Sequence, residues 1–395
     1  MEIEAPSISM LTDLRSRLDR FVVQFQDCFM RSSTREHLRT YMRGQTSALE
    51  RKSVEPMALA AGVPPRTLQE FLSLSRWDHD LMRAGVLRRV LQKHPSSTAI
   101  ALIDETSFPK KGDQTAGVQR QYCGAKGRTE NCVVAVYLGY ATAQFHALVD
   151  CALFLPEQTW AENIQRRRAA GIPDALPFRT KPQIAVELLR SAQADGAQFK
   201  YLTADELYGS SSAFRGAVAA LGITYVVEVN PTVCGWTQQP ASASPGVHAG
   251  TRRVDSVWSR SGPSWIPLHI KETEKGPVVW EVKAGRFWPS CDGECLSEGW
   301  LLQMRHALSG ELKYFLSNAA ADTPLEVLLH VAFSRAEIEQ LFEAAKGEIG
   351  LDHFEVRHYR PLIRHLIVSL ASLLFLAEEN TRLRKKKLLV EPMPG

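Results

Sequence analysis

The sequence predicts an α/β protein in which a helical segment comes before a mixed β-sheet and a β-rich segment is inserted into that sheet. Three observations lead to this fold class. Residues 10–95 carry apolar residues at a spacing of about 3.6 without strand-like alternation. From residue 98, short apolar strands alternate with helices. Residues 231–310 are rich in Pro, Ser, Gly and Trp and contain short alternating runs. At 395 residues, the chain can bury one large core or several smaller ones.

One stretch of the helical segment has the form of helix, short turn, helix. In EPMALAAGVPPRTLQEFLS (55–73), Ala58 and Gly62 are small where two helices would cross, and the two prolines suit a helix start. A helix-turn-helix here would present three side chains to a DNA groove, namely Arg66, Thr67 and Gln69. An ordinary helical hairpin has the same pattern, so both interpretations stay open.

Residues 98–230 predict strands and helices in a characteristic order. TAIALIDET (98–106) is a buried strand, and the runs at 131–142 and 145–156 form an antiparallel hairpin with a tight connection. A helix at 182–196, a strand at 199–209, a helix at 211–222 and a strand at 223–230 follow. Three antiparallel strands followed by alternating helices and strands is the order of a ribonuclease H-like sheet.

The rest of the chain predicts an insertion and a return to the sheet. Six of the eight tryptophans fall within residues 231–310, where they fit a small core, although one or two could stack on an unpaired base. ELKYFLSNA (311–319) predicts a return strand, and helices follow it. The longest apolar run, at 366–377, is too short to span a bilayer and predicts a buried helix.

Composition narrows the class of protein. The seven scattered cysteines favour reduced thiols in a cytosol, and no N-terminal stretch has the form of a signal peptide. The net charge is +4, with a basic surplus in residues 1–95 and a basic cluster at 382–387. Basic ends of this kind fit a polyanionic partner. Solvated helix faces and a frayed tail would give the same pattern.

Three acidic residues occupy positions suited to a metal site. Asp104 and Asp205 each end a predicted strand, and the helix at 334–350 offers Glu339. Strand ends fix a carboxylate while leaving it open to solvent, which suits a hard divalent cation. At about 100° per residue, Arg335, Glu339 and Lys346 fall within roughly 40° of one another on the helix. Helical geometry leaves Glu343 as an alternative to Glu339.

Other acids compete less well for this role. Glu105 and Glu206 follow the two aspartates directly, and strand alternation points them to the opposite face. Glu355 is a further alternative for the third acid.

The combined motifs resemble those of DDE transposases of bacterial insertion sequences. The spacing Arg335, three residues, Glu339, six residues, Lys346 is similar to the Arg-Glu-Lys part of their Tyr-Arg-Glu-Lys motif. LIDETSFPKKG and RQYCGAKGRTENCVVAV resemble the first-aspartate region of one branch of these enzymes, and TADELYG resembles the second. The similarity spans about residues 20–375. The motif's tyrosine would fall at Ala332, beside Phe333, so it is absent or moved.

The resemblance implies a ribonuclease H-like core with two Mg²⁺ or Mn²⁺ ions held by Asp104, Asp205 and Glu339. The implied reaction is DNA end cleavage followed by strand transfer in a cut-and-paste cycle. Arg335 and Lys346 would grip DNA phosphates. Basic residues after the first aspartate would lie in a loop beside the metals and contact phosphates: Lys110, Lys111, Arg120 and Lys126.

Some relatives with this insertion free their element through a DNA hairpin, which needs a flipped base held by an aromatic side chain. Trp288 and Trp300 are the candidates for that role in this chain, and core packing explains either tryptophan equally well.

The implied partners are double-stranded DNA, as terminal inverted repeats and as target, and a second copy of the chain on paired ends. We expect a bacterial cytoplasmic, nucleoid-associated protein that does not enter a membrane. An alternative is a transposase-derived DNA-binding regulator that does not cut, and a third class is a simple hydrolytic nuclease. The predicted domains are a helical DNA-binding domain (1–95), a catalytic core in two parts (96–230 and 311–380), a β-rich insertion (231–310) and a basic tail (381–395).

Overall fold

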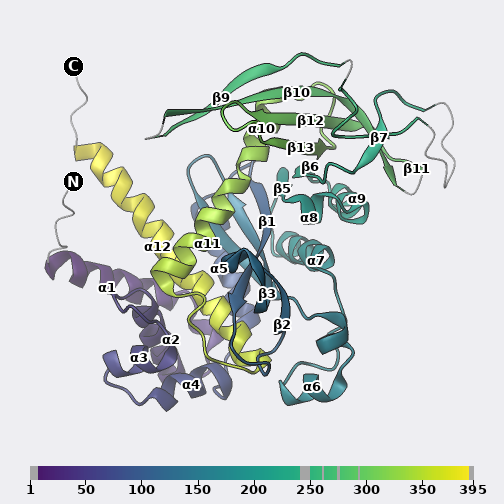
Figure 1. Cartoon of the computed structure of the whole chain (residues 1–395). Coiled ribbons are helices and arrows are strands. Elements are labelled where there is room, and N and C mark those ends of the chain that lie inside the picture. The colour runs from purple at the N-terminus through teal and green to yellow at the C-terminus, as the bar shows by residue number, and fades with distance from the viewer. Residues whose placement is uncertain (1–7, 241–249, 260–261, 274–275, 292–293, 391–395) are drawn as a thin grey trace.

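A computed structural model describes residues 8–240, 250–259, 262–273, 276–291 and 294–390 (Figure 1). For residues 8–12, 269–273, 276–278, 294 and 385–390 it describes the backbone alone. Part of the predicted basic tail, residues 391–395, lies outside the described residues, as do residues 1–7 of the predicted helical domain and 241–249 of the insertion.

The first segment is helical, as predicted. Its helices are α1 (Ile8–Val23), α2 (Ser32–Gln45), α3 (Val54–Ala60), α4 (Pro65–Ser73) and α5 (His79–Lys93), with a short 3-10 turn, η1, at Gln26–Cys28. Helices α2, α4 and α5 pack against the long C-terminal helix α12 (Tyr359–Val390). Apolar side chains from these helices and from the sheet belong to one continuous hydrophobic cluster.

The predicted helix-turn-helix pair exists as α3 and α4, with one correction. Ala58 is buried between helices as expected. Gly62 is exposed instead of lying at a helix crossing, and its φ of 68° shows why a glycine stands there. The left-handed conformation lets the backbone N–H of Val63 return to the carbonyl of Ala58, which closes the end of α3.

The central sheet has the predicted ribonuclease H-like order. β1 (Ile100–Pro109), β3 (Arg128–Ala141) and β4 (His146–Leu153) are antiparallel, while β5 (Tyr201–Ala204) and β6 (Thr224–Glu228) continue from β1 as parallel strands. The spatial order is β4-β3-β1-β5-β6. β2 (Gln119–Cys123) forms a hairpin with the start of β3 around a 3-10 turn, η2, at Gly124–Lys126.

Helices cover both faces of this sheet. Figure 1 shows α11 (Arg335–Ile349) and α12 on one side, and α7 (Lys181–Ala194) and α9 (Ser212–Ala220) on the other. The shorter helical elements are η3 (Glu157–Ala161), α6 (Ile164–Ala169), α8 (Glu206–Gly209) and α10 (Leu325–Phe333). Residues on opposite faces of β1 therefore meet different helices, and this alternation decides the roles of Asp104 and Glu105.

The insertion is β-rich, as predicted, and it extends the central sheet. Its strands are β7 (Cys234–Trp236), β8 (Arg252–Arg253), β9 (Ile266–Thr273), β10 (Gly276–Cys291), β11 (Glu294–Cys295) and β12 (Gly299–His306). The predicted return strand, β13 (Leu312–Ser317), pairs with β12 on one edge and with β6 on the other. The open edge of β6 is thereby covered, which removes a row of unpaired backbone groups.

Helix α12 is longer than the apolar run that predicted it. Its segment Tyr359–Arg384 is long and apolar enough, by length and composition, to cross a membrane, but 78% of the most apolar window is buried inside the protein. The helix packs against β4 and against the N-terminal helices. We therefore interpret it as the central core helix, in agreement with the predicted buried helix.

Candidate active site

Asp104 lies inside β1 and not at its end, which corrects the prediction. β1 stays paired with β3 as far as Pro109, whereas its parallel pairing with β5 stops at Ile103 opposite Ala204. β5 leaves the sheet at the next residue, Asp205. The carboxylates of Asp104 and Asp205 therefore emerge from neighbouring strands at the point where those strands separate.

Asp205 is oriented by the short helix that follows it. Its side chain caps α8, with Oδ1 accepting hydrogen bonds from the backbone N–H groups of Leu207 (3.0 Å) and Tyr208 (3.4 Å). Asp104 Oδ1 accepts a similar bond from the N–H of Glu105 at 2.7 Å. Backbone donors thus fix both carboxylates, and neither depends on a flexible side chain for its position.

The predicted catalytic acids share one pocket. A cavity of about 460 Å³ is lined by Asp104, Asp205 and Glu339. Lys346 lines it as predicted, and Glu343 of the same helix is also present. Glu105 lines it as well, and so do Lys181 and Tyr122, which the sequence analysis did not single out.

Burial and mutual repulsion shift the ionisation of the aspartate pair. Burial raises the pKa of Asp104 to about 7, and the negative charge of Asp205 adds to this shift. Burial raises the pKa of Asp205 to about 6, with a further contribution from Glu105. Two half-buried carboxylates that repel each other are the hard oxygen donors that a divalent cation prefers, and a cation would relieve their repulsion. The aspartate pair therefore fits a metal ion.

Glu339 faces the same pocket, but its carboxylate is engaged elsewhere. Its Oε1 lies 2.9 Å from the guanidinium of Arg335, one turn earlier on α11, and its side chain is 56% exposed. Among the described residues, no three His, Cys, Asp or Glu side chains form a ready-made metal cluster. The structure thus brings the aspartates together and leaves Glu339 ion-paired at the pocket's edge.

Arg335 sits among the acids. In addition to Glu339, its guanidinium lies 3.6 Å from Asp104 Oδ2 and 3.7 Å from Glu228 Oε2. The surrounding carboxylates raise the pKa of Arg335 against the effect of burial. Glu228 was missed by the sequence analysis, although it lies toward the end of the predicted strand at 223–230, as Asp205 lies toward the end of the one at 199–209, and it is the last residue of β6. That shared position was a usable signal.

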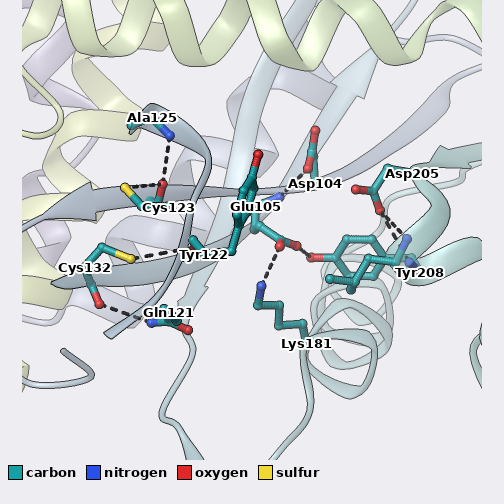
Figure 2. Close-up of polar contacts among 12 residues, drawn as sticks. Asp104, Glu105, Gln121, Tyr122, Cys123, Ala125, Cys132, Lys181, Asp205 and Tyr208 are labelled. Carbon is teal, nitrogen blue, oxygen red and sulfur yellow. Dashed lines mark hydrogen bonds and ion pairs between the residues drawn. The ribbon is translucent and has the colours of Figure 1, made fainter. Parts of the chain in front are cut away.

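Glu105 points away from Asp104, as the pleat of the strand requires (Figure 2). One carboxylate oxygen accepts a hydrogen bond from Lys181 Nζ at 2.5 Å, and the other accepts one from the hydroxyl of Tyr208 at 2.5 Å. Lys181 is the first residue of α7. Tyr208 lies in α8, the short helix that starts directly after Asp205. Glu206 is exposed and is the first residue of α8, so the strand alternation that was used to predict its direction does not apply to it.

Lys110 and Lys111 lie at a different place from the one predicted. Because β1 continues to Pro109, these residues are about 20 Å along the chain from Asp104. They line a separate cavity of about 810 Å³ near Phe354 and Glu355. Lys110 Nζ donates to the Phe354 carbonyl at 2.8 Å, and burial lowers its pKa to about 8. The prediction that Lys110 and Lys111 lie in a loop beside the metal site is therefore wrong.

The other predicted DNA-binding residues lie on the β2–β3 hairpin, on α4 and, in the case of the two tryptophans, on the insertion. Arg120 on β2 and Lys126 in η2 are exposed on the hairpin beside the pocket. On α4, Arg66 and Gln69 are exposed and Thr67 is half-buried, and Arg66 forms an ion pair with Glu70 at 2.6 Å. Their DNA contacts stay predictions.

The two candidate tryptophans lie on the insertion sheet and do not line the pocket that holds the acids. Trp288 is half-buried and pairs across the sheet with Trp236. Trp300 is half-buried, its indole N–H donates to the carbonyl of Ala320, and the guanidinium of Arg286 lies 5.0 Å from its ring centre. At the position of the missing motif tyrosine, Ala332 is buried in α10.

The fold and the paired aspartates define a class, the ribonuclease H-like nucleases and transposases. Within that class, the family model described as DDE superfamily endonuclease matches residues 24–278, and the chain belongs to that family. The match contains Asp104 and Asp205. The resemblance inferred from the motifs is therefore confirmed at the level of the family.

A curated relative supports the same assignment. The probable transposase for insertion sequence element IS701 of Microchaete diplosiphon is 34% identical over 188 residues. The alignment covers 47% of this chain and 46% of the relative, so the chain matches about half the length of that protein.

Proposed function

We propose that this protein is the transposase of a bacterial insertion sequence, which cuts DNA at the ends of its element and transfers the freed strands into target DNA. The observation that carries the proposal is the pair of half-buried aspartates at the point where β1 and β5 separate. Membership in an endonuclease family and the similarity to a probable insertion-sequence transposase support it.

Asp104 and Asp205 are the residues that would hold two Mg²⁺ or Mn²⁺ ions, with Glu339 as the third acid. Such ions lower the pKa of an attacking water or 3′-hydroxyl and stabilise the leaving oxygen in a displacement at phosphorus. The backbone donors around both aspartates keep their carboxylates oriented without help from the substrate. Glu339 would join them by exchanging its ion pair with Arg335.

The cations of the site have distinct roles in this proposal. Arg335 neutralises the acids while the site is empty of substrate, and its planar guanidinium suits a DNA phosphate when Glu339 turns away. Lys346 lies on the same helix, about three turns after Arg335 and two turns after Glu339, and lines the pocket, where it would contact the next phosphate. Arg120 and Lys126 would extend this track across the β2–β3 hairpin.

The partners in the proposed cycle are the element's terminal inverted repeats, the target DNA and a second copy of the chain on paired ends. The exposed face of α4, with Arg66 and Gln69, is the proposed reader of the repeats. The proposed location is the bacterial cytoplasm, with the protein associated with the nucleoid. A hairpin intermediate held by Trp288 or Trp300 belongs to the same set of proposals.

The test uses the full-length protein with Mg²⁺ or Mn²⁺ and DNA that carries the sequences flanking its gene. Wild-type protein should nick at the repeat boundary and join the freed end to a second DNA. Asp205→Asn should abolish nicking but keep binding. Glu206→Gln, the exposed acid next in sequence, is the matched control and should cut normally.

Two outcomes would overturn the proposal. Sequence-specific binding without cleavage under either metal would favour the alternative of a transposase-derived regulator. Cutting without preference for the element's ends would favour a simple nuclease.

A further inference from the structure

The hairpin of β2 and β3 places one exposed aromatic side chain at the rim of the candidate active site. Tyr122 is 67% exposed, and it lines the same pocket as Asp104 and Asp205. Figure 2 shows its side chain projecting from the hairpin toward the strand that carries Asp104 and Glu105. An exposed aromatic ring beside the carboxylates of a pocket can stack on the flat face of a ligand.

The hairpin is tied to the strand that carries Asp104. Ser107, three residues after Asp104 in β1, accepts hydrogen bonds from the backbone N–H of Ala125 (3.2 Å) and from the thiol of Cys123 (3.3 Å). Beneath the hairpin, Cys123, Cys132 and Val134 form a small buried cluster. The Tyr122 backbone is therefore held at a fixed place relative to the aspartates, which is a requirement for a binding residue.

The charge around Tyr122 points to a nucleic acid strand. Arg120, Lys126 and Arg128 are exposed on the same hairpin, and Glu130, which pairs with Arg128 at 2.7 Å, is the acid beside them. Lys181 reaches the pocket from α7. An aromatic ring interleaved with cations is the arrangement by which proteins bind unpaired nucleotides, because the ring stacks on a base while the cations follow the phosphates.

We propose that Tyr122 stacks on an unpaired base of the DNA strand whose reacting phosphate lies in the pocket lined by Asp104 and Asp205. The β2–β3 hairpin is then a contact for the strand end, with Lys126 on the adjacent backbone phosphate. This inference rests on the proposed function, since it assumes that DNA is the substrate of the pocket. It adds a site residue that neither the motif resemblance nor the family match assigns.

The experiment uses full-length Asp205→Asn protein and a duplex from the gene's flank that carries a short single-stranded arm with 2-aminopurine at the junction. Stacking on Tyr122 should quench the probe's fluorescence. Tyr122→Ala should remove the quenching and weaken binding of the armed DNA by about tenfold or more. Tyr122→Phe should keep both, because it retains the ring. Leu308→Ala, at a side chain that is 86% exposed on the insertion, is the matched control and should behave as the parent protein.

Blunt duplex provides the second readout. The loss of affinity in Tyr122→Ala should be confined to armed DNA, and thermal melting should match the parent protein because the ring is exposed. Unchanged quenching in Tyr122→Ala would overturn the proposal. Equal losses in Tyr122→Phe and Tyr122→Ala would also overturn it, because they would assign the effect to the hydroxyl.

This failure is distinguishable from a failure of the proposed function. Wild-type protein that nicks at the element's ends, combined with Tyr122→Ala protein that binds and quenches like its parent, would sink the stacking role alone. Wild-type protein that never cuts would reject the transposase.

Discussion

At the scale of single residues, we expect Tyr208 and Glu105 to position Asp205 without contacting DNA. Glu105 accepts a hydrogen bond from the Tyr208 hydroxyl, and the backbone N–H of Tyr208 donates to Asp205 Oδ1. Tyr208→Phe removes the hydroxyl and keeps the buried ring. The rate of nicking at saturating DNA should fall about tenfold, equivalent to about 1.4 kcal/mol, while the DNA dissociation constant stays the same.

Single-turnover nicking and equilibrium binding measure these two quantities separately. Tyr201→Phe, on β5 ahead of Asp205, is the control and should keep the wild-type rate. If Tyr208→Phe lowers thermal stability and affinity as much as the rate, the hydroxyl supports the fold in general and does not position Asp205.

The residue scale also shows where prediction from sequence ends. The pleat of β1 was enough to predict that Asp104 and Glu105 face opposite ways. The partners of Glu105 come from 76 and 103 residues further along the chain, as Lys181 and Tyr208. No local pattern reports such a contact, so the sequence could demote Glu105 as a metal ligand but could not reveal what it holds.

At the scale of elements, the limits of prediction are clearest in β1. The apolar run stopped before Asp104, Thr106 was the last residue of the predicted strand, and Ser107 looked like the start of a loop. Both are buried polar residues inside the strand, and Ser107 Oγ is occupied by the β2–β3 hairpin. A buried polar residue satisfied by another element cannot be distinguished from a loop residue by alternation alone. Lys110 and Lys111 were misplaced for this reason.

The contact between Arg83 of α5 and Asp150 of β4 is expected to make the free energy of unfolding depend on pH. Arg83 donates to the buried carboxylate of Asp150 at 2.6 Å, yet burial still raises the pKa of Asp150 to about 6. Because the folded pKa exceeds the unfolded one, the folded state keeps its proton longer, and stability falls as pH rises between these values. Arg83→Met removes the compensating charge and raises that pKa further.

The variant should therefore lose little stability near pH 5 and about 3 kcal/mol near pH 8, measured by urea unfolding at both values. Asp80, a more exposed acid also near Arg83, provides the control, because Asp80→Asn should have a small effect at either pH. If Arg83→Met loses the same stability at both pH values, the loss comes from packing and not from the charge of Asp150.

The contact between α12 and α2 predicts the opposite pH dependence. His365 is fully buried, with the Tyr41 hydroxyl 2.8 Å from Nδ1 and the Leu351 carbonyl 2.9 Å from Nε2. Burial lowers the pKa of His365 to about 4. The unfolded chain then takes up a proton first as pH falls, so the stabilising contribution is full above about pH 6.5 and is lost toward pH 4.

The lost contribution is on the order of 3 kcal/mol by linkage. His365→Gln should be less stable than wild type at neutral pH, with a difference that shrinks as the pH approaches 4. Urea unfolding of both proteins across this range gives that difference directly, and groups common to both cancel. A constant difference would mean that the pKa of His365 is the same in the folded and unfolded protein.

At the scale of the whole molecule, the order of the central sheet followed from the order of predicted strands and helices. Two larger relationships did not. The pairing of β13 with β6 joins the insertion to the central sheet across a long stretch of sequence. The packing of α2, α4 and α5 on α12 joins the two ends of the chain. Both depend on surfaces that meet only after folding, and the predicted boundary at residue 95 stays a prediction.

Arg364 is the residue that most directly connects the two ends of the chain. Its guanidinium reaches from α12 and donates to three carbonyls at 2.9 to 3.0 Å. The carbonyl of Leu72 lies in the last turn of α4, and those of Ser75 and Trp77 lie just after the helix. The guanidinium also lies 4.5 Å from the ring centre of Trp77. The side chain is buried, which lowers the pKa of Arg364 to about 10, and the carbonyl groups at the C-terminal end of α4 offset part of this effect.

Arg364→Met leaves those carbonyls buried without a donor, and we expect a loss of about 3 to 5 kcal/mol in the free energy of unfolding. Arg360→Met, one turn earlier and exposed, should change it by less than about 0.5 kcal/mol. If the N-terminal helices and the central sheet fold as one unit, circular dichroism and protease resistance of both ends should be lost together in Arg364→Met. If residues 1–95 instead become protease-sensitive while the sheet keeps its full stability, Arg364 fastens a separable unit onto α12, which is the behaviour expected of an independent DNA-binding domain.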